Sequence, residues 1–236
     1  MIFSKDTKEL RWYSDKGSVG NYSDEIRPMF SVLPEWYKQT QRWVEDAGLQ
    51  PNPYPGVKNC LPFLDGLTSG YALVLTEDIF VEQTPDGPVV RFAVPRKFPP
   101  VQNRPPHATD PMPVPLGYSK EHFLWVKQVA VEAPDGYSIL YTHPLNRFDL
   151  PFLTVSAIVD DYPMPGANIS FFLKEGFEGV ISAGTPVAQL IPFKREDWKA
   201  VKDKKMYERS NENIKSTETL LGGYYRKNFW RKKSFK

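Results

Sequence analysis

The sequence contains little cysteine and little histidine. Among its 236 residues, Cys60 is the single cysteine and there are three histidines. One cysteine can form neither an internal disulfide nor a zinc site built from several thiolates. Three histidines would be enough in number for a three-histidine centre, but no motif supports one. We therefore expect neither a metal nor a cofactor.

Long hydrophobic runs and the motifs of common enzyme classes are also missing. No apolar run approaches the roughly 18–20 residues that a transmembrane helix needs. The first residues, which include Lys5, Asp6 and Lys8, contain no apolar signal segment. There is no Walker loop, Gly-x-Gly-x-x-Gly, His-Glu-x-x-His or Gly-x-Ser-x-Gly. We expect no catalytic residues, no membrane contact and no secretion by a signal peptide.

Proline, by contrast, is abundant, with 23 residues in the chain. Each proline fixes φ and removes a backbone donor, so this density favours short strands joined by rigid turns. Short apolar segments recur between such turns, and Thr84-Pro-Asp-Gly87 predicts a hairpin between Ile79–Glu82 and Val89–Val94. We predict a mainly β protein, a single antiparallel β-sandwich, barrel or β-clip-like domain. Its core should bury three stretches together: Tyr71–Leu75, Phe152–Val159 and Val187–Ile191.

The patterning divides the chain into three parts. Residues 1–56 form an N-terminal arm with a short helix that begins at Pro34 and ends before Gly48. Residues 57–193 form the β domain, in which the proline-rich residues 95–118 are a long loop. Residues 194–236 begin with a charged helix over 194–221, which Gly222 and Gly223 end. A basic, aromatic tail follows.

This basic tail, residues 226–236, carries six cations and no acid, whereas the rest of the chain is mildly acidic. Its candidate partner-binding residues are Arg226, Lys227, Phe229, Trp230, Arg231, Lys232 and Lys233. The cations could pair with phosphates while the aromatic rings stack on bases or dock in a protein groove. The alternative is a solvated tail that aids solubility. The sequence leaves both interpretations open.

Two weaker candidates involve histidine. Cys60 could act as a nucleophile with His107, His122 or His143, but we favour a small buried thiol beside Leu61. His107 and Asp110 lie in the proline-rich segment at a spacing that does not fit a facial metal triad.

Two stretches carry a resemblance to a known fold family. Ala157–Tyr162 and Gly179–Ile191 resemble motifs of the dUTPase and dCTP deaminase proteins. The resemblance implies a β-clip fold, usually trimeric, in which Asp160, Asp161 and Tyr162 face a ligand. It also implies that Asn146 and Arg147 line the same pocket, with Arg147 meeting an anion. The alternative for residues 160–163 is an ordinary turn at a strand end.

Over a longer span, the chain resembles a family of uncharacterised proteins of tailed phages and bacteria. The matching segments are Leu33–Lys38, Leu61–Tyr71, Thr142–Arg147 and Ile191–Trp198. This resemblance implies a phage-type origin, one domain with terminal extensions, and a place in the host cytoplasm or the virion.

We therefore expect a non-enzymatic, β-rich structural protein of the phage type. It would self-assemble as a homo-oligomer or dock to other virion proteins through its terminal arms, and nucleic acid could bind its basic tail. The alternative is a nucleotide-binding protein or nucleotide hydrolase on a dUTPase-like oligomer.

Overall fold

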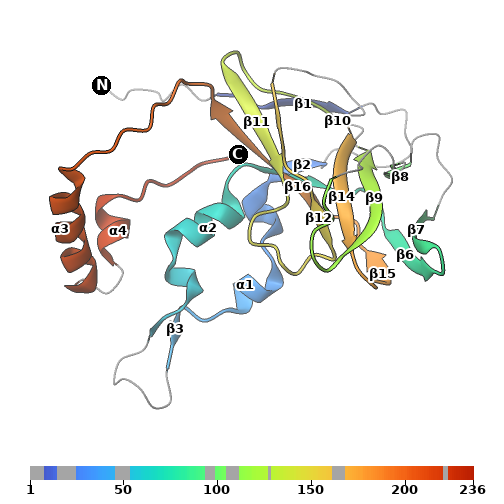
Figure 1. Ribbon diagram of the computed structural model, residues 1–236, viewed down its shortest axis with the longest axis horizontal. Coiled ribbons are helices and arrows are strands. Elements are labelled where there is room, and N and C mark those ends of the chain that lie inside the picture. Colours follow the sequence, from blue (N-terminus) through green and yellow to red (C-terminus); the bar gives the residue numbers. More distant parts are fainter. Residues whose placement is uncertain are drawn as a thin grey trace.

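The computed structural model describes residues 8–14, 25–45, 54–93, 99–104, 112–126, 129–160, 168–219 and 223–236. Within these residues the protein is mainly β, and its strands pair in antiparallel fashion (Figure 1). The predicted fold class is confirmed in this form. The strands lie in separate sheets and do not close into a single barrel.

Three sheets make up the β body. The largest has the order β13 (Ala157–Val159), β11 (Tyr137–Thr142), β16 (Pro186–Lys194), β5 (Tyr71–Val74) and β2 (Ile26–Pro28). The second has the order β12 (Phe152–Thr154), β14 (Asn168–Lys174), β9 (Tyr118–Val126) and β8 (Val101–Asn103). The third has the order β15 (Gly179–Ile181), β6 (Ile79–Thr84) and β7 (Gly87–Phe92).

Smaller elements surround this body. Two ribbons pair β1 (Arg11–Ser14) with β10 (Val129–Glu132) and β3 (Trp43–Val44) with β4 (Tyr54–Pro55). The helical elements are η2 (Met29–Val32), α1 (Glu35–Gln39), η3 (Val57–Asn59), α2 (Leu61–Thr68), α3 (Met206–Thr219) and α4 (Gly223–Asn228). In Figure 1, α1 and α2 lie beside the body, whereas α3 and α4 stand apart from it.

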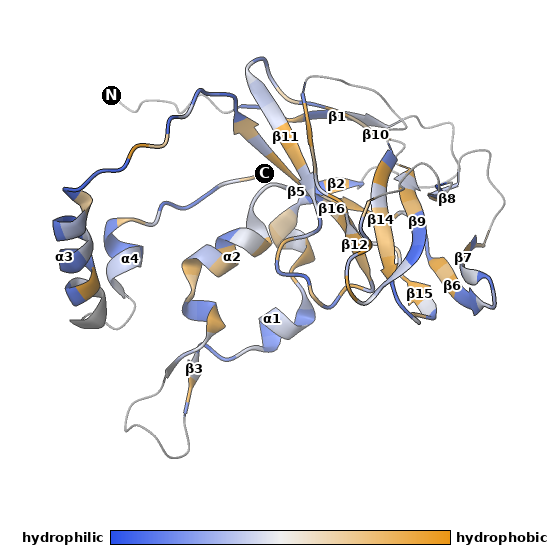
Figure 2. Cartoon of the chain, viewed as in Figure 1, coloured by the Kyte–Doolittle hydropathy of each residue, from blue (hydrophilic) through white to orange (hydrophobic). Residues whose placement is uncertain are grey.

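The three sheets of the β body share one hydrophobic core. Leu73, Phe152 and Leu190 all belong to it, so the three predicted core stretches do pack together. Trp125 stacks on Phe171 with ring centroids 3.6 Å apart. Figure 2 shows the hydrophobic residues concentrated on the strands, while α3 is mainly hydrophilic. Burial of apolar side chains between sheets therefore holds the β body together.

The hairpin predicted around Thr84–Gly87 is confirmed. β6 and β7 pair from Ile79 with Phe92 to Thr84 with Gly87. Gly87 has a φ of 114°, a conformation that favours glycine, and the Thr84 hydroxyl donates to its carbonyl at 2.7 Å.

Two apolar segments fold differently from the prediction. Residues 152–159 do not form one strand but split into β12 and β13, which belong to different sheets. The Val155 N–H still bonds to the Ser170 carbonyl, after which the chain crosses to the largest sheet. The predicted β domain, which starts at residue 57, begins with the helical elements η3 and α2 before its first strand. Pro62 lies in the first turn of α2, a position that suits proline.

The N-terminal helix is shorter than predicted, because α1 ends at Gln39. Both the N–H and the hydroxyl of Thr40 bond to the Trp36 carbonyl, and Thr40 itself is extended. Trp43 then pairs with Pro55 instead of continuing the helix. The hydrogen bond of the Thr40 side chain and the pairing of β3 with β4 thus outweigh the helical spacing of the apolar residues.

The predicted loop 95–118 also contains regular structure. Val101–Asn103 pairs with β9 as an edge strand, β8, and β9 begins at Tyr118. The three residues of β8 include no proline, which leaves their N–H groups free to pair. Residues 94–98 and 105–111 lie outside the described residues.

The predicted C-terminal helix begins twelve residues later than expected, at Met206. Lys194 pairs with Tyr137 and so ends β16, and residues 195–205 have no helix. The Asp203 carboxylate accepts the Lys205 N–H at 2.9 Å just before α3 starts. Gly222 lies outside the described residues, and Gly223 begins α4.

Candidate functional site

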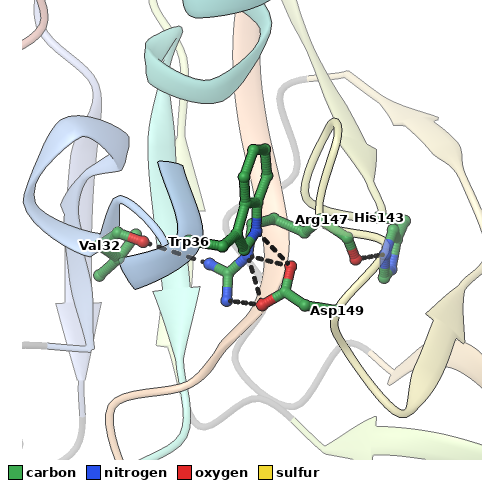
Figure 3. A network of polar contacts seen from close by, with 5 residues as sticks. All are labelled: Val32, Trp36, His143, Arg147 and Asp149. Atoms are coloured by element: carbon green, nitrogen blue, oxygen red, sulfur yellow. Dashed lines mark hydrogen bonds and ion pairs between the residues drawn. The ribbon is translucent and has the colours of Figure 1, made fainter. Parts of the chain in front are cut away.

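Arg147 occupies the centre of a polar network (Figure 3). Its Nε and Nη2 each donate to the Asp149 carboxylate at 2.9 Å, and its Nη1 donates to the Val32 carbonyl at 3.2 Å. The Trp36 indole N–H also donates to Asp149, at 3.3 Å. Arg147 is only 7% exposed. Since all three guanidinium nitrogens have protein partners, this arginine joins the turn after β11 to η2 and α1.

Burial and these contacts shift the pKa values of Asp149 and His143. Burial raises the pKa of Asp149, but the hydrogen bonds and charge of Arg147 outweigh it and hold that pKa below its ordinary value. Burial lowers the pKa of His143, so this imidazole is neutral at pH 7. His143 Nδ1 accepts the Thr154 N–H at 3.3 Å, which leaves Nε2 to donate to the Arg147 carbonyl at 3.1 Å. Both ring nitrogens of His143 are therefore hydrogen-bonded within the protein, and the network stabilises the fold.

Asn146 belongs to the same turn and packs against α2. It has a φ of 60°, and its Nδ2 donates to the Phe63 carbonyl at 3.3 Å. Beside it, Gln189 of β16 is fully buried. The Gln189 amide accepts the Leu145 N–H at 2.8 Å and donates to the Gly66 carbonyl at 3.0 Å and to the Ser69 carbonyl. This buried amide joins the turn, the helix and the sheet.

The remaining predicted ligand residues do not join this cluster. Asp160 accepts the Ser138 hydroxyl at 2.6 Å and pairs with Arg195 at 3.4 Å. Ser138 and Thr142 lie at opposite ends of β11, about 13 Å apart at the usual rise of a strand. Asp160 and Arg147 therefore lie at different ends of the sheet. Asp161 and Tyr162 lie outside the described residues.

The basic tail contacts the protein's own body. The Trp230 indole N–H donates to the Asp65 carboxylate of α2 at 3.0 Å, and Lys233 forms an ion pair with the same oxygen. The Phe235 ring packs edge-on against Tyr71 with centroids 5.8 Å apart. At least these residues of the tail are docked, so a freely solvated tail does not describe them.

Where the tail returns, a basic and aromatic pocket forms, which we call the α2–α4 pocket. Its volume is about 320 Å³, and its lining includes Arg42, Trp43, Lys58, Leu61, Arg226 and Trp230. The sequence pointed to Arg226 and Trp230 as tail residues but missed the others. They come from a segment assigned to a helix and from the start of the β domain, so no local pattern indicated that they meet.

The other chemical candidates are dispersed. Cys60, expected to be buried, is exposed just before α2. His122 is buried and stacks on Phe172, and His107 and Asp110 lie outside the described residues. The described part of the chain holds no group of three or more His, Cys, Asp or Glu residues placed to bind a metal. None of the helices among the described residues is long and apolar enough to span a membrane.

No protein-family model and no curated protein matches the chain.

Proposed function

We propose that this protein is a non-enzymatic assembly protein of the phage type, and that copies associate through the C-terminal arm. By this term we mean residues 195–219, the extended segment and α3. The arm leaves the β body after β16, and the chain returns to the body through α4 and the basic tail (Figure 1).

The observation that supports this proposal is the exposure of the arm's large apolar side chains. Trp198 is 87% exposed, Tyr207 is 72% exposed and Ile214 is 52% exposed, and Val201 and Met206 are exposed as well. Tyr207 and Ile214 are seven residues apart and so lie on one face of α3. Such side chains contribute nothing to the core of this chain, and exposed apolar surface of this kind marks contact sites.

The charges of the arm favour a second copy as the partner. Residues 195–219 carry seven cations and six acids in mixed order. A surface with both signs can pair with an identical surface across a two-fold axis, whereas a surface of one sign would repel its copy. The arm therefore suits an isologous contact.

The test compares two double variants of the full chain by light scattering coupled to size exclusion. Tyr207→Ala with Ile214→Ala removes the apolar face of α3, and Ile158→Ala with Val180→Ala removes exposed apolar groups of the β body as a matched control. We expect the wild type and the control to form oligomers as concentration rises over about 1–100 µM, and the arm variant to stay monomeric. A wild type that remains monomeric throughout, or equal dissociation of both variants, would overturn the proposal.

A further inference from the structure

We propose that the α2–α4 pocket binds a nucleotide, either free or within a single strand. The phosphate contacts Arg42 and Arg226, and the base stacks on Trp43. This site differs from the residues that the dUTPase resemblance implied. It also uses none of the apolar arm residues that carry the assembly proposal, so the two proposals can fail separately.

The charge of the pocket points to an anion. Arg42, Lys58 and Arg226 come from three separate segments and line one cavity, whose lining contains no carboxylate. Neither Arg42 nor Arg226 has an ion-pair partner among the described residues. Three cations in one concave site repel one another and concentrate a field that favours a phosphate.

The pocket walls are held in place by the protein itself. The Asn59 amide donates to the Arg42 carbonyl at 2.5 Å, and the Gly56 N–H donates to the same carbonyl at 2.8 Å. Lys58 Nζ donates to the Lys38 carbonyl at 2.7 Å, which leaves two of its three N–H groups for a ligand. Asp65 fixes the Trp230 indole. A site formed before binding loses less conformational freedom when its ligand arrives.

The aromatic groups and the size of the pocket narrow the ligand class. Trp43 is half exposed on the short β3–β4 ribbon, where its ring adds nothing to the core. Exposed rings beside cations are the usual platform for stacking bases. A volume of about 320 Å³ accommodates one nucleotide and is too small to enclose a duplex.

The experiment titrates the full chain with three probes: fluorescein-labelled oligothymidylate of about 12 nucleotides, dTMP, and inorganic phosphate. Arg42→Ala, Arg226→Ala and Trp43→Ala remove pocket groups that are all exposed, and circular dichroism checks that each variant folds. Lys174→Ala and Trp12→Ala are matched controls, since they remove one exposed cation and one exposed ring that lie outside both the pocket and the C-terminal arm.

We expect each pocket variant to weaken binding about tenfold and each control to change it less than about twofold. Binding of dTMP as well as the oligonucleotide would identify a free nucleotide as sufficient, and binding of the oligonucleotide alone would identify a single strand. The proposal would be overturned if neither the oligonucleotide nor dTMP bound at about 1 mM. It would also be overturned by equal losses in the pocket and control variants, by phosphate binding as tightly as dTMP, or by equal binding of a labelled oligoglutamate.

Discussion

Glu25 should make the stability of this protein depend on pH. The residue directly precedes β2 and is 4% exposed, and one of its carboxylate oxygens has no hydrogen-bond partner. Burial raises its pKa to about 7, although a hydrogen bond from Ser14 lowers it in part. The folded protein therefore holds a proton on Glu25 that the unfolded chain releases near its ordinary pKa of 4.5.

The sign and size of the effect follow from linkage. Below pH 4.5 Glu25 is protonated in both states and costs nothing. The free energy of unfolding then falls as pH rises from about 4.5 to about 7, and levels off above that. A tenfold change in proton affinity corresponds to about 1.4 kcal/mol, so the full loss above pH 8 is about 3 kcal/mol. Glu25→Gln removes the titration and with it this loss. At the size of this domain, the corresponding rise in melting temperature is about 5–10 °C.

Urea denaturation of the wild type and Glu25→Gln at pH 5 and pH 8.5 measures this directly. The amide places two N–H donors in a buried site, which adds a constant cost at both pH values. The informative quantity is therefore the change in the difference between the two proteins, which we expect to favour the variant by about 2–3 kcal/mol at the higher pH. Glu175→Gln, at an exposed glutamate, is the control and should show no such change. A difference that is the same at both pH values would refute the reasoning.

Three further predictions concern the contacts that join the helical elements to the sheet. Arg147→Ala should lower the free energy of unfolding by about 2–4 kcal/mol, because it leaves the Asp149 carboxylate without its partner, and a double-mutant cycle with Asp149→Ala should recover part of that loss. Gln189→Leu should cost about 2–4 kcal/mol in urea denaturation, because three backbone groups lose a buried partner; a loss below about 0.5 kcal/mol would contradict this. Asp65→Ala removes the acceptor of the Trp230 indole N–H and should release the indole, measured as faster proteolysis of the basic tail and a change in tryptophan fluorescence, with the β body's melting temperature lowered by no more than a few degrees.

Some of the candidate site could be predicted and some could not. The sequence indicated Thr142–Arg147 as a motif. Asp149, the carboxylate that pairs with Arg147, lies only two residues further along the chain. However, the guanidinium also bonds to the Val32 carbonyl, and Trp36 completes the carboxylate's partners. Those two residues precede Arg147 by more than a hundred positions. A motif alone does not show whether an arginine faces a ligand or its own chain.

The α2–α4 pocket shows the same limit. The alternation of cations and rings in the basic tail left open whether the tail binds a partner or is solvated. It did not indicate that the tail returns to α2, since that depends on Asp65, a single carboxylate in a helix that the sequence did not predict. Arg42 and Lys58 carry no local signature, because isolated cations between prolines are ordinary surface residues.

What the sequence by itself determined was the class of the protein: short strands, rigid turns such as Thr84–Gly87, and one apolar core. These depend on backbone preferences and hydrophobic patterns that act within a few residues. The tertiary structure alone decided how residues 152–159 divide between two sheets, which partner Arg147 takes, and where the tail lies. The physical reason is that such pairings depend on which surfaces remain unburied after the sheets form, and that is a property of the whole chain.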